Sequence, residues 1–221
     1  MEKTQYIVWD WNGTLLDDVP TCVRVMNGML RRRGLPLLTR ERYREIFTFP
    51  VREYYRLAGL DLDREPFEAL AVEYIGEYNR RALGCGLYPG AEGVLRRLAD
   101  AGYTQIIASA SERGALARQV EARGITAYFQ ALLGVGDSLG TTKAGLARDY
   151  LRQRGASPAD AVFVGDTLHD WEVAAAMGCA CVLIEGGHQS RARLEGTGAD
   201  LLEDIAQLPS YLERHYFEIQ R

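Results

Sequence analysis

Carboxylates, hydroxyl groups and a lysine follow short apolar runs at four places in this 221-residue sequence. These residues are Asp10 with Asn12, Ser109-Ala110-Ser111, Lys143, and Asp166 with Asp170. Clustered carboxylates repel one another unless a cation or shared protons neutralise them. An all-oxygen set of ligands suits Mg²⁺, which takes few protein carboxylates and keeps several waters. The pattern therefore predicts a magnesium site with a hydroxyl group and a lysine beside it.

The apolar runs before these residues are typical of buried strands. They are short and lack a clean alternation of apolar and polar residues, which indicates strands covered on both faces. They span 6–9, 103–108, 132–135, 161–164 and 180–184, with a further edge strand at 200–202. Helical patterns lie between or after these runs. They cover 91–101, the segment from a predicted cap at Ser111 to Gly124, 146–154 and 208–217. This alternation predicts an α/β fold with a parallel sheet, whose strand ends converge on one ligand site.

One long segment interrupts the alternation of strands and helices. Between residues 17 and 85 the sequence shows helical patterns and no convincing strand. The signals are an apolar face at Val19, Val23, Met26 and Leu30 that ends at Gly34, a cap at Thr39, a helix from Pro50 to Gly59, and a first-turn proline at Pro66. We expect a helical cap domain over 17–85, inserted into a core domain formed by 1–16 and 86–221.

Composition and charge exclude several classes of protein. Hydrophobic residues make up 47% and charged residues 25%, which is the composition of a globular chain with a sizeable core. The formal net charge is −4, from 26 basic and 30 acidic residues, so no basic field exists to hold nucleic acid or an anionic membrane. The expected partner is a small molecule, and the expected assembly is a monomer or a homodimer.

Neither the cysteines nor the apolar runs indicate secretion or a membrane span. Cys22, Cys85, Cys179 and Cys181 have no spacing typical of a metal site or a disulfide framework, so we expect reduced thiols. The longest uncharged apolar stretch, 173–184, is well short of the ~20 residues that span a bilayer. No signal peptide is recognisable at the N-terminus, so the expected location is the cytoplasm.

Four ordered motifs give the sequence a resemblance to a known family. The segments VWDWNGTLLDD and LYPGAEGVLRRLADAGYTQIIASAS, Lys143, and VFVGDTLHD are similar in order and spacing to the four motifs of the haloacid dehalogenase superfamily of phosphohydrolases. The similarity is closest to the branch of phosphoglycolate phosphatase and β-phosphoglucomutase, which carries a helical cap after the first motif. It implies the Rossmann-like parallel sheet of that superfamily and a Mg²⁺-dependent phosphatase acting on a small phosphorylated metabolite.

The resemblance also implies a role for individual residues. Asp10 matches the nucleophile that forms an aspartyl-phosphate, and its other oxygen would bind Mg²⁺. Ser109 matches the hydroxyl that binds a phosphoryl oxygen, and Lys143 matches the cation that pairs with the nucleophile and the phosphoryl group. Asp166 matches a metal ligand, and Asp170 matches an acid that ligates the metal or holds a metal-bound water. The implied substrate contacts include Gly13, Thr14 and Ala110.

Asn12 departs from the family pattern at the position of the general acid and base. Its backbone carbonyl can still ligate Mg²⁺, but its amide has no proton to trade near neutral pH. Losing general acid catalysis costs about 10² to 10⁴ in rate. Three alternatives remain open: a leaving group that needs no proton, a substitute acid such as His169 or His188, or a slowed enzyme. The first predicts a preference for good leaving groups such as acyl or aryl phosphates.

The cap is expected to select the substrate. Arg52 resembles the arginine that grips a distal anionic group in the mutase branch, and a two-pronged contact with a carboxylate or second phosphate would suit a phosphoglycolate-like or sugar phosphate substrate. The alternative for Arg52 is a solvated surface arginine. The alternative for the protein is a weakened phospho-ligand binding or regulatory module. A dehalogenase is disfavoured by the Asp166 and Asp170 motif, and a phosphomutase by Asn12.

Overall fold

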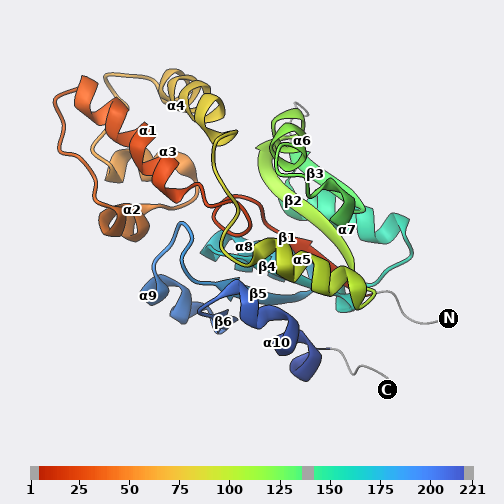
Figure 1. Cartoon of the computed structure of the whole chain (residues 1–221). Coiled ribbons are helices and arrows are strands. Elements are labelled where there is room, and N and C mark those ends of the chain that lie inside the picture. Colours follow the sequence, from red (N-terminus) through yellow and green to blue (C-terminus); the bar gives the residue numbers. More distant parts are fainter. Residues whose placement is uncertain (1–4, 136–141, 217–221) are drawn as a thin grey trace.

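A six-stranded parallel sheet forms the centre of the molecule in the computed structural model, which describes residues 5–135 and 142–216 (Figure 1). The strands lie in the order β3-β2-β1-β4-β5-β6. Their bounds are β1 Tyr6–Trp9, β2 Thr104–Glu112, β3 Ala131–Val135, β4 Ala161–Gly165, β5 Ala180–Ile184 and β6 Asp200–Leu202. The predicted α/β class with a parallel sheet flanked by helices is confirmed.

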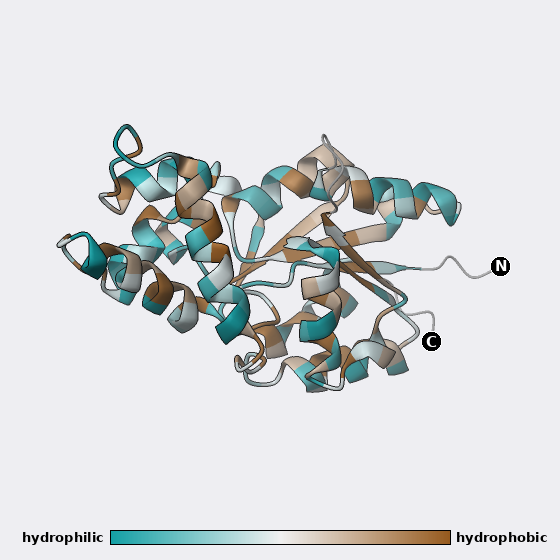
Figure 2. Ribbon diagram, turned by 90° about the horizontal axis from the view of Figure 1, so that it is seen from above, coloured by the Kyte–Doolittle hydropathy of each residue, from teal (hydrophilic) through white to brown (hydrophobic). Residues whose placement is uncertain are grey.

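Strand β1 lies in the middle of the sheet, between β2 and β4, and apolar side chains cover both of its faces. Ile7 and Trp9 pack on one face with side chains of α5, α6 and α10, whereas Tyr6 and Val8 pack on the other with α7 and α8. These four side chains are at most 5% exposed. A strand buried on both faces needs no polar alternation, which explains the continuous apolar run. Figure 2 shows the brown apolar strands between helices whose outer faces are largely teal.

The helices of the core follow the strands, as the alternating pattern predicts. They are α5 Ala91–Asp100, α6 Arg113–Glu121, α7 Lys143–Gln153, α8 Leu168–Met177, α9 Arg191–Leu194 and α10 Leu208–His215, with short 3₁₀ turns at Thr126–Tyr128, Pro158–Asp160, Glu195–Thr197 and Ile205–Gln207. The predicted closing helix ends at His215, and its expected last residue, Phe217, lies outside the described residues.

Two boundaries differ from the prediction because of side-chain capping. Ser111 was expected to cap α6, but this expectation is wrong: the side chain of Glu112 accepts hydrogen bonds from the backbone N–H groups of Gly114 and Ala115. Strand β2 consequently continues past Ala108 to Glu112, with an irregular register after Ser109. Helix α7 begins at Lys143 rather than at Leu146, because the Thr142 hydroxyl accepts from Gly145 and caps the helix there.

The insert after β1 consists of helices, as predicted. They are α1 Val19–Arg32, α2 Arg40–Ile46, α3 Val51–Leu57 and α4 Phe67–Ala82. Their buried side chains, among them Met26, Tyr43 and Leu70, form a hydrophobic cluster of their own. The expected cap at Thr39 is present, since its hydroxyl accepts from the backbone of Arg42. Figure 1 shows the four helices grouped beside the carboxyl edge of the sheet.

The chain enters and leaves the insert side by side. Asp17 donates its backbone N–H to the carbonyl of Gly86 at 3.0 Å, and Tyr88 donates to Leu15 at 2.9 Å. These bonds lie at the predicted boundaries between the core and the cap. The division into two domains, 17–85 and the remainder, stays a prediction.

Two further sequence expectations have structural counterparts. All four cysteines are free in the structure. Among residues 5–135 and 142–216, the helices are too short or too polar for one of them to cross a membrane.

Candidate active site

The carboxyl ends of β1 and β4 bring the predicted acidic residues together. Asp10 follows β1 directly, and its backbone N–H donates to the carbonyl of Val164 in β4 at 2.8 Å. Asp166 follows β4, and Asp170 lies in the first turn of α8. The carboxylate oxygens of the three residues lie within 4.8 Å of one another, and all three side chains are buried. Parallel strands place their ends at one edge of the sheet, so residues 156 positions apart in sequence become neighbours.

Lys143 joins two of these carboxylates. Its ammonium group donates to Oδ1 of Asp10 and, at 2.6 Å, to Oδ1 of Asp170. The lysine side chain is only 5% exposed. A buried ammonium group is stable only when paired, and here two ion pairs replace its lost hydration. Lys143 lies at the start of α7, a position set by the Thr142 cap, and from there its side chain reaches Asp10.

Asp170 is held by the N-terminus of its own helix. Its Oδ2 accepts hydrogen bonds from the backbone N–H groups of Asp166 and Thr167, at 3.1 and 3.0 Å, and from the Thr167 hydroxyl at 2.7 Å. Gly165 is required beside it, because a Cβ there would lie 2.3 Å from the Cβ of Asp170. Asp170 therefore acts as a fixed anchor for Lys143, and Oδ1 is the oxygen that faces the cluster.

Asp166 is held by two segments that are distant in sequence. The Thr14 hydroxyl donates to Oδ1 at 2.8 Å, and the backbone N–H of His188 donates to Oδ2 at 2.5 Å. Added Cβ atoms at Gly13 and Gly187 would lie 2.5 and 2.1 Å from the Asp166 carboxylate, so both positions need glycine. Gly13 also has a φ of 77°, which favours glycine. Gly13 and Thr14 thus position Asp166, and they do not line the cavity described below.

The charge of the cluster fits a divalent cation. Three buried carboxylates face one lysine, which leaves an excess of two negative charges if all are ionised. Burial and the charges of Asp170 and Asp166 raise the pKa of Asp10, although Lys143 acts against this rise. Burial and the charge of Asp170 also raise the pKa of Asp166. Burial acts to raise the pKa of Asp170, but Lys143 outweighs it and lowers this pKa. A divalent cation relieves this repulsion, and the all-oxygen donor set is one that Mg²⁺ prefers.

Ser109 and Ser111 lie at the irregular end of β2. Ser109 is buried, and its Oγ accepts from the backbone N–H of Ser111 at 3.1 Å. The hydroxyl of Ser111 donates to Oδ1 of Asn12 at 2.9 Å. Gly134 of β3 makes this bend possible, because a Cβ there would lie 2.6 Å from the Cα of Arg113. Ser109 and Ala110 both line the cavity beside Asp10.

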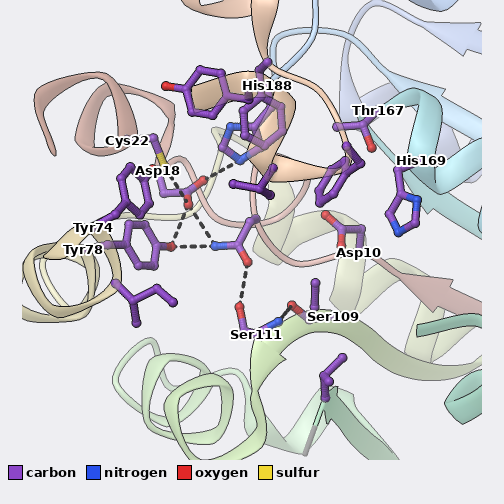
Figure 3. Close-up of a pocket in the computed structure, with 18 of the residues that line it drawn as sticks. Asp10, Asp18, Cys22, Tyr74, Tyr78, Ser109, Ser111, Thr167, His169 and His188 are labelled. Atoms are coloured by element: carbon purple, nitrogen blue, oxygen red, sulfur yellow. Dashed lines mark hydrogen bonds and ion pairs between the residues drawn. The ribbon is translucent and has the colours of Figure 1, made fainter. Parts of the chain in front are cut away.

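Asn12 is fixed by a network that sequence reasoning missed. Its Nδ2 donates to Oδ2 of Asp18 at 2.9 Å and contacts the hydroxyl of Tyr78 at 2.6 Å, and Tyr78 itself donates to Asp18 at 2.7 Å (Figure 3). With the bond from Ser111, the amide uses both its oxygen and its nitrogen. Tyr78 comes from α4 of the insert, so Asn12 links the loop after β1 to the insert. The Asp17-Asp18 pair in the first motif was the one available signal for Asp18.

His188 completes this network as the partner of Asp18. Its Nε2 lies 3.4 Å from Oδ1 of Asp18, and its Nδ1 lies 2.7 Å from the hydroxyl of Tyr43. Burial acts to lower the pKa of His188, but the charge and hydrogen bond of Asp18 outweigh it and raise the pKa to about 9. His188 in turn holds the pKa of Asp18 below its usual value, against the effect of burial. The pair is therefore ionised at neutral pH.

The Asp18–His188 pair predicts a pH-dependent stability. The folded pKa of His188, about 9, exceeds the ordinary histidine value of 6.5, so its stabilisation is complete below pH 6.5 and is lost as the pH rises through about 9. The shift corresponds to about 3 kcal/mol. Urea unfolding in EDTA at pH 6.5 and 9.5 would measure it. The raised pKa of Asp10 also makes the free energy of unfolding fall as the pH rises. The contribution of His188 is therefore the difference between the pH slopes of wild type and His188→Gln. Equal slopes in both proteins would contradict the prediction.

A cavity of about 450 Å³ lies between the core and the insert. Asp10, Asn12, Ser109 and Lys143 line its core side, and side chains of α3, α4 and the segment before α3 line its cap side. The predicted catalytic residues are therefore brought together in one cavity. Figure 3 shows Asp10, Ser109, Thr167 and His169 around the side of the cavity away from Tyr74 and Tyr78.

Arg52 does not contact this cavity. Its guanidinium group donates to Glu68 at 2.9 Å and lies over the ring of Phe67 at 4.8 Å, and its side chain is 45% exposed. The neighbouring side chains of Phe49 and Val51 line the cavity instead. Arg52, predicted to grip a distal anion, thus lies outside the lining of the cavity, because the first turn of α3 directs it toward Glu68 of α4.

His169 lies at the edge of the cavity. Its ring packs against Phe49 at 4.5 Å between centroids, and its Nδ1 lies 3.4 Å from Glu172. His188 is engaged by Asp18 and Tyr43. Of the two histidines considered as substitute acids, His169 is thus the one without a buried partner.

The fold and the motifs are shared with known proteins. Residues 7–184 match the family described as "Haloacid dehalogenase-like hydrolase". A phosphoglycolate phosphatase of Rhodobacter capsulatus is 28% identical over 211 residues, covering 94% of this chain and 96% of the relative. A haloacid dehalogenase-like hydrolase of Streptococcus pneumoniae superposes with a TM-score of 0.81 at 20% identity, covering 96% of this chain and all of that one. The Mycobacterium tuberculosis protein tyrosine kinase A superposes with a TM-score of 0.79 at 25% identity, covering 96% and 99%.

The chain belongs to the family of haloacid dehalogenase-like hydrolases. It is an enzyme of the phosphatase type within that family, as the motifs and the curated relatives together indicate. The similarity to a protein described as a tyrosine kinase shows that this fold serves more than one substrate class, so the substrate must be argued from the site.

Proposed function

We propose that the protein is a Mg²⁺-dependent phosphatase that hydrolyses a small phosphorylated metabolite through an aspartyl-phosphate on Asp10. The observation that carries this proposal is the buried cluster in which Lys143 bridges Asp10 and Asp170 beside Asp166, at the base of the cavity between core and insert. Phosphoryl transfer needs alignment and charge neutralisation more than covalent help from the protein. This cluster supplies both.

Each residue of the cluster has a defined task in this reaction. A carboxylate oxygen of Asp10 attacks phosphorus, and water then hydrolyses the acyl phosphate. Lys143 aligns Asp10 and opposes the rise in its pKa, and it neutralises charge on the transferred group. Ser109 binds a phosphoryl oxygen when its hydroxyl turns toward the cavity.

The residues that would hold Mg²⁺ are Asp10, Asp166 and the backbone carbonyl of Asn12, with Asp170 beside them. When bound, the cation supplies positive charge that offsets the cluster and the incoming phosphate. The Thr14 hydroxyl and the His188 backbone N–H orient the oxygens of Asp166, as hydrogen bonds to a metal ligand do.

A second candidate function is a phospho-ligand binding or regulatory module. Asn12 favours it, because the amide at this position cannot transfer a proton during turnover. Such a module would bind phosphate esters without releasing phosphate.

Phosphate release and trapping of the intermediate distinguish the two. The wild-type protein is assayed with five phosphomonoesters, among them phosphoglycolate and phenyl phosphate. It should release phosphate in about 5 mM Mg²⁺, and the rate should be at least about 100-fold lower in EDTA. Rapid acid quench should leave one phosphoryl group on the protein, on a peptide that contains Asp10. Ligand-induced stabilisation without phosphate release would instead support the binding module.

A further inference from the structure

We infer that the site acts on phosphate monoesters of aromatic alcohols, whose leaving oxygen departs as a phenoxide. This inference rests on the proposed phosphatase function and names the substrate class of the same site. It follows from two independent features: the aromatic wall that the cap presents to the nucleophile, and the lack of a proton donor at Asn12.

The cap side of the cavity is a continuous wall of rings. Neighbouring rings in this wall have centroids 5.2 to 6.2 Å apart. The wall consists of Phe47, Phe49, Tyr54, Tyr55, Tyr74 and Tyr78, with Val51 and Ile75 at its edges. Tyr54 and Tyr55 are at most 2% exposed, so their rings are held in place by the cap core. An aromatic leaving group would gain both apolar burial and ring contacts here.

The same wall offers little to an anionic leaving group. Among the described residues no arginine lines the cavity. Lys143 is engaged by Asp10 and Asp170, and the protonated His188 is engaged by Asp18. Arg52 pairs with Glu68, and Arg44 donates to the carbonyl of Gly187. A carboxylate placed against the cap would lose its hydration without gaining a cation. Phosphoglycolate, whose leaving group carries a carboxylate, is therefore a poor fit.

The residues around Asn12 cannot supply the proton that an alkoxide leaving group needs. The side-chain amide of Asn12 donates its hydrogens to Asp18 and to the hydroxyl of Tyr78. Asp18 is paired with His188, and Tyr78 donates its proton to Asp18. Figure 3 shows these groups hydrogen-bonded to one another. A phenoxide is stable enough to leave without a proton, whereas an alkoxide is not.

The reaction balances without an added co-reactant. A bond forms between Asp10 and phosphorus while the bond from phosphorus to the aryl oxygen breaks, and the electron pair leaves with the phenoxide. The phenoxide takes a proton from water after departure. This protonation leaves a hydroxide ion. Hydrolysis of the aspartyl-phosphate consumes it, which releases phosphate and regenerates the carboxylate of Asp10.

A series of substrates and inhibitors separates binding from leaving-group chemistry. We expect kcat/KM for phenyl phosphate to exceed that for phosphoglycolate by at least about 100-fold, and to fall steeply as the pKa of substituted phenols rises. 2-Phenylethyl phosphate has the ring but a poor leaving group. It should therefore be turned over slowly yet inhibit with a Ki about 10-fold to 100-fold below that of phosphoglycolate. Asn12→Asp should make the dependence on leaving-group pKa shallower.

A matched pair of variants on α4 tests the cap wall directly. Ile75 lines the cavity and is 54% exposed, so Ile75→Arg adds a cation there with little strain. Val72 lies on the same helix, is 73% exposed and does not line the cavity. Ile75→Arg should shift the ratio of kcat/KM values toward phosphoglycolate by about 10-fold or more, and Val72→Arg should leave the ratio unchanged.

The outcomes separate this inference from the proposed function. Asp10-dependent phosphate release that favours phosphoglycolate or a sugar phosphate over phenyl phosphate would overturn the inference and leave the phosphatase intact. A shallow leaving-group dependence in wild type that steepens in His169→Gln would also overturn it, because His169 would then be the acid. No Asp10-dependent release from any ester would overturn the proposed function itself.

Discussion

Asp10→Asn is expected to lower the rate of phosphate release by about 10⁴-fold or more, because the amide cannot form the acyl phosphate. The substitution keeps the shape of the side chain and removes one of three buried carboxylates. The pKa of Asp10 is raised in the folded protein by burial and by Asp170 and Asp166, which means that its ionised form is disfavoured there. Unfolding in EDTA should therefore show a stability equal to or above that of wild type. Loss of activity with retained stability would assign Asp10 to the chemistry.

The control for this variant is Asp149→Asn, a change of the same kind at an exposed position on α7. It should alter neither the rate nor the stability beyond about 0.5 kcal/mol. If Asp10→Asn kept a tenth or more of the wild-type rate, Asp10 would not be the nucleophile.

Lys143→Met is expected to affect both activity and folding. Removing the ammonium group leaves Asp10 and Asp170 buried without their shared cation, and breaking such a pair costs about 3 to 5 kcal/mol. The rate should fall by about 10² to 10³, because positive charge near the transferred phosphoryl group is lost. The folded state already raises the pKa of Lys143 through Asp10 and Asp170, although burial opposes this rise. The lysine therefore stays charged in the cluster.

Added Mg²⁺ should recover part of the stability lost in Lys143→Met, because a divalent cation offsets the same carboxylates. Urea unfolding in EDTA and in excess Mg²⁺ would measure this recovery. Arg148→Met, at an exposed position on the same helix, is the matched control and should lie within about 0.5 kcal/mol of wild type. Equal stability of Lys143→Met and wild type in EDTA would contradict the ion-pair argument.

The sequence predicted the sheet well because its strands are buried on both faces. The fully buried strand β1 at 6–9 coincides with its predicted bounds, as do β5 at 180–184 and the edge strand at 200–202. Local side-chain chemistry also predicted the helix cap at Thr39. Prediction failed where two capping groups compete: Ser111 has the right side chain for an N-cap, but Glu112 reaches the free backbone N–H groups of α6 and Ser111 turns to Asn12.

The residues around Asn12 were not predictable in the same way. Asp18 is eight positions beyond Asp10, Tyr78 lies on the fourth helix, and His188 follows β5. Their contacts depend on the sharp loop at Gly13 and on the packing of the cap against the core. Sequence spacing contains no information on either. The same packing decided that Arg52 faces Glu68 and not the cavity.

The sequence by itself determined the α/β class, and it predicted a shared site for Asp10, Ser109, Lys143, Asp166 and Asp170 with an amide at Asn12. It could do so because strand ends of a parallel sheet converge whatever the details of packing. Only the tertiary structure decided what surrounds that set. The aromatic wall, the ionised pair of Asp18 and His188, and the lack of a lining arginine among the described residues arise where the cap meets the core. Those contacts join segments up to 170 residues apart, as Asp18 and His188 show, and only the packed chain brings them together.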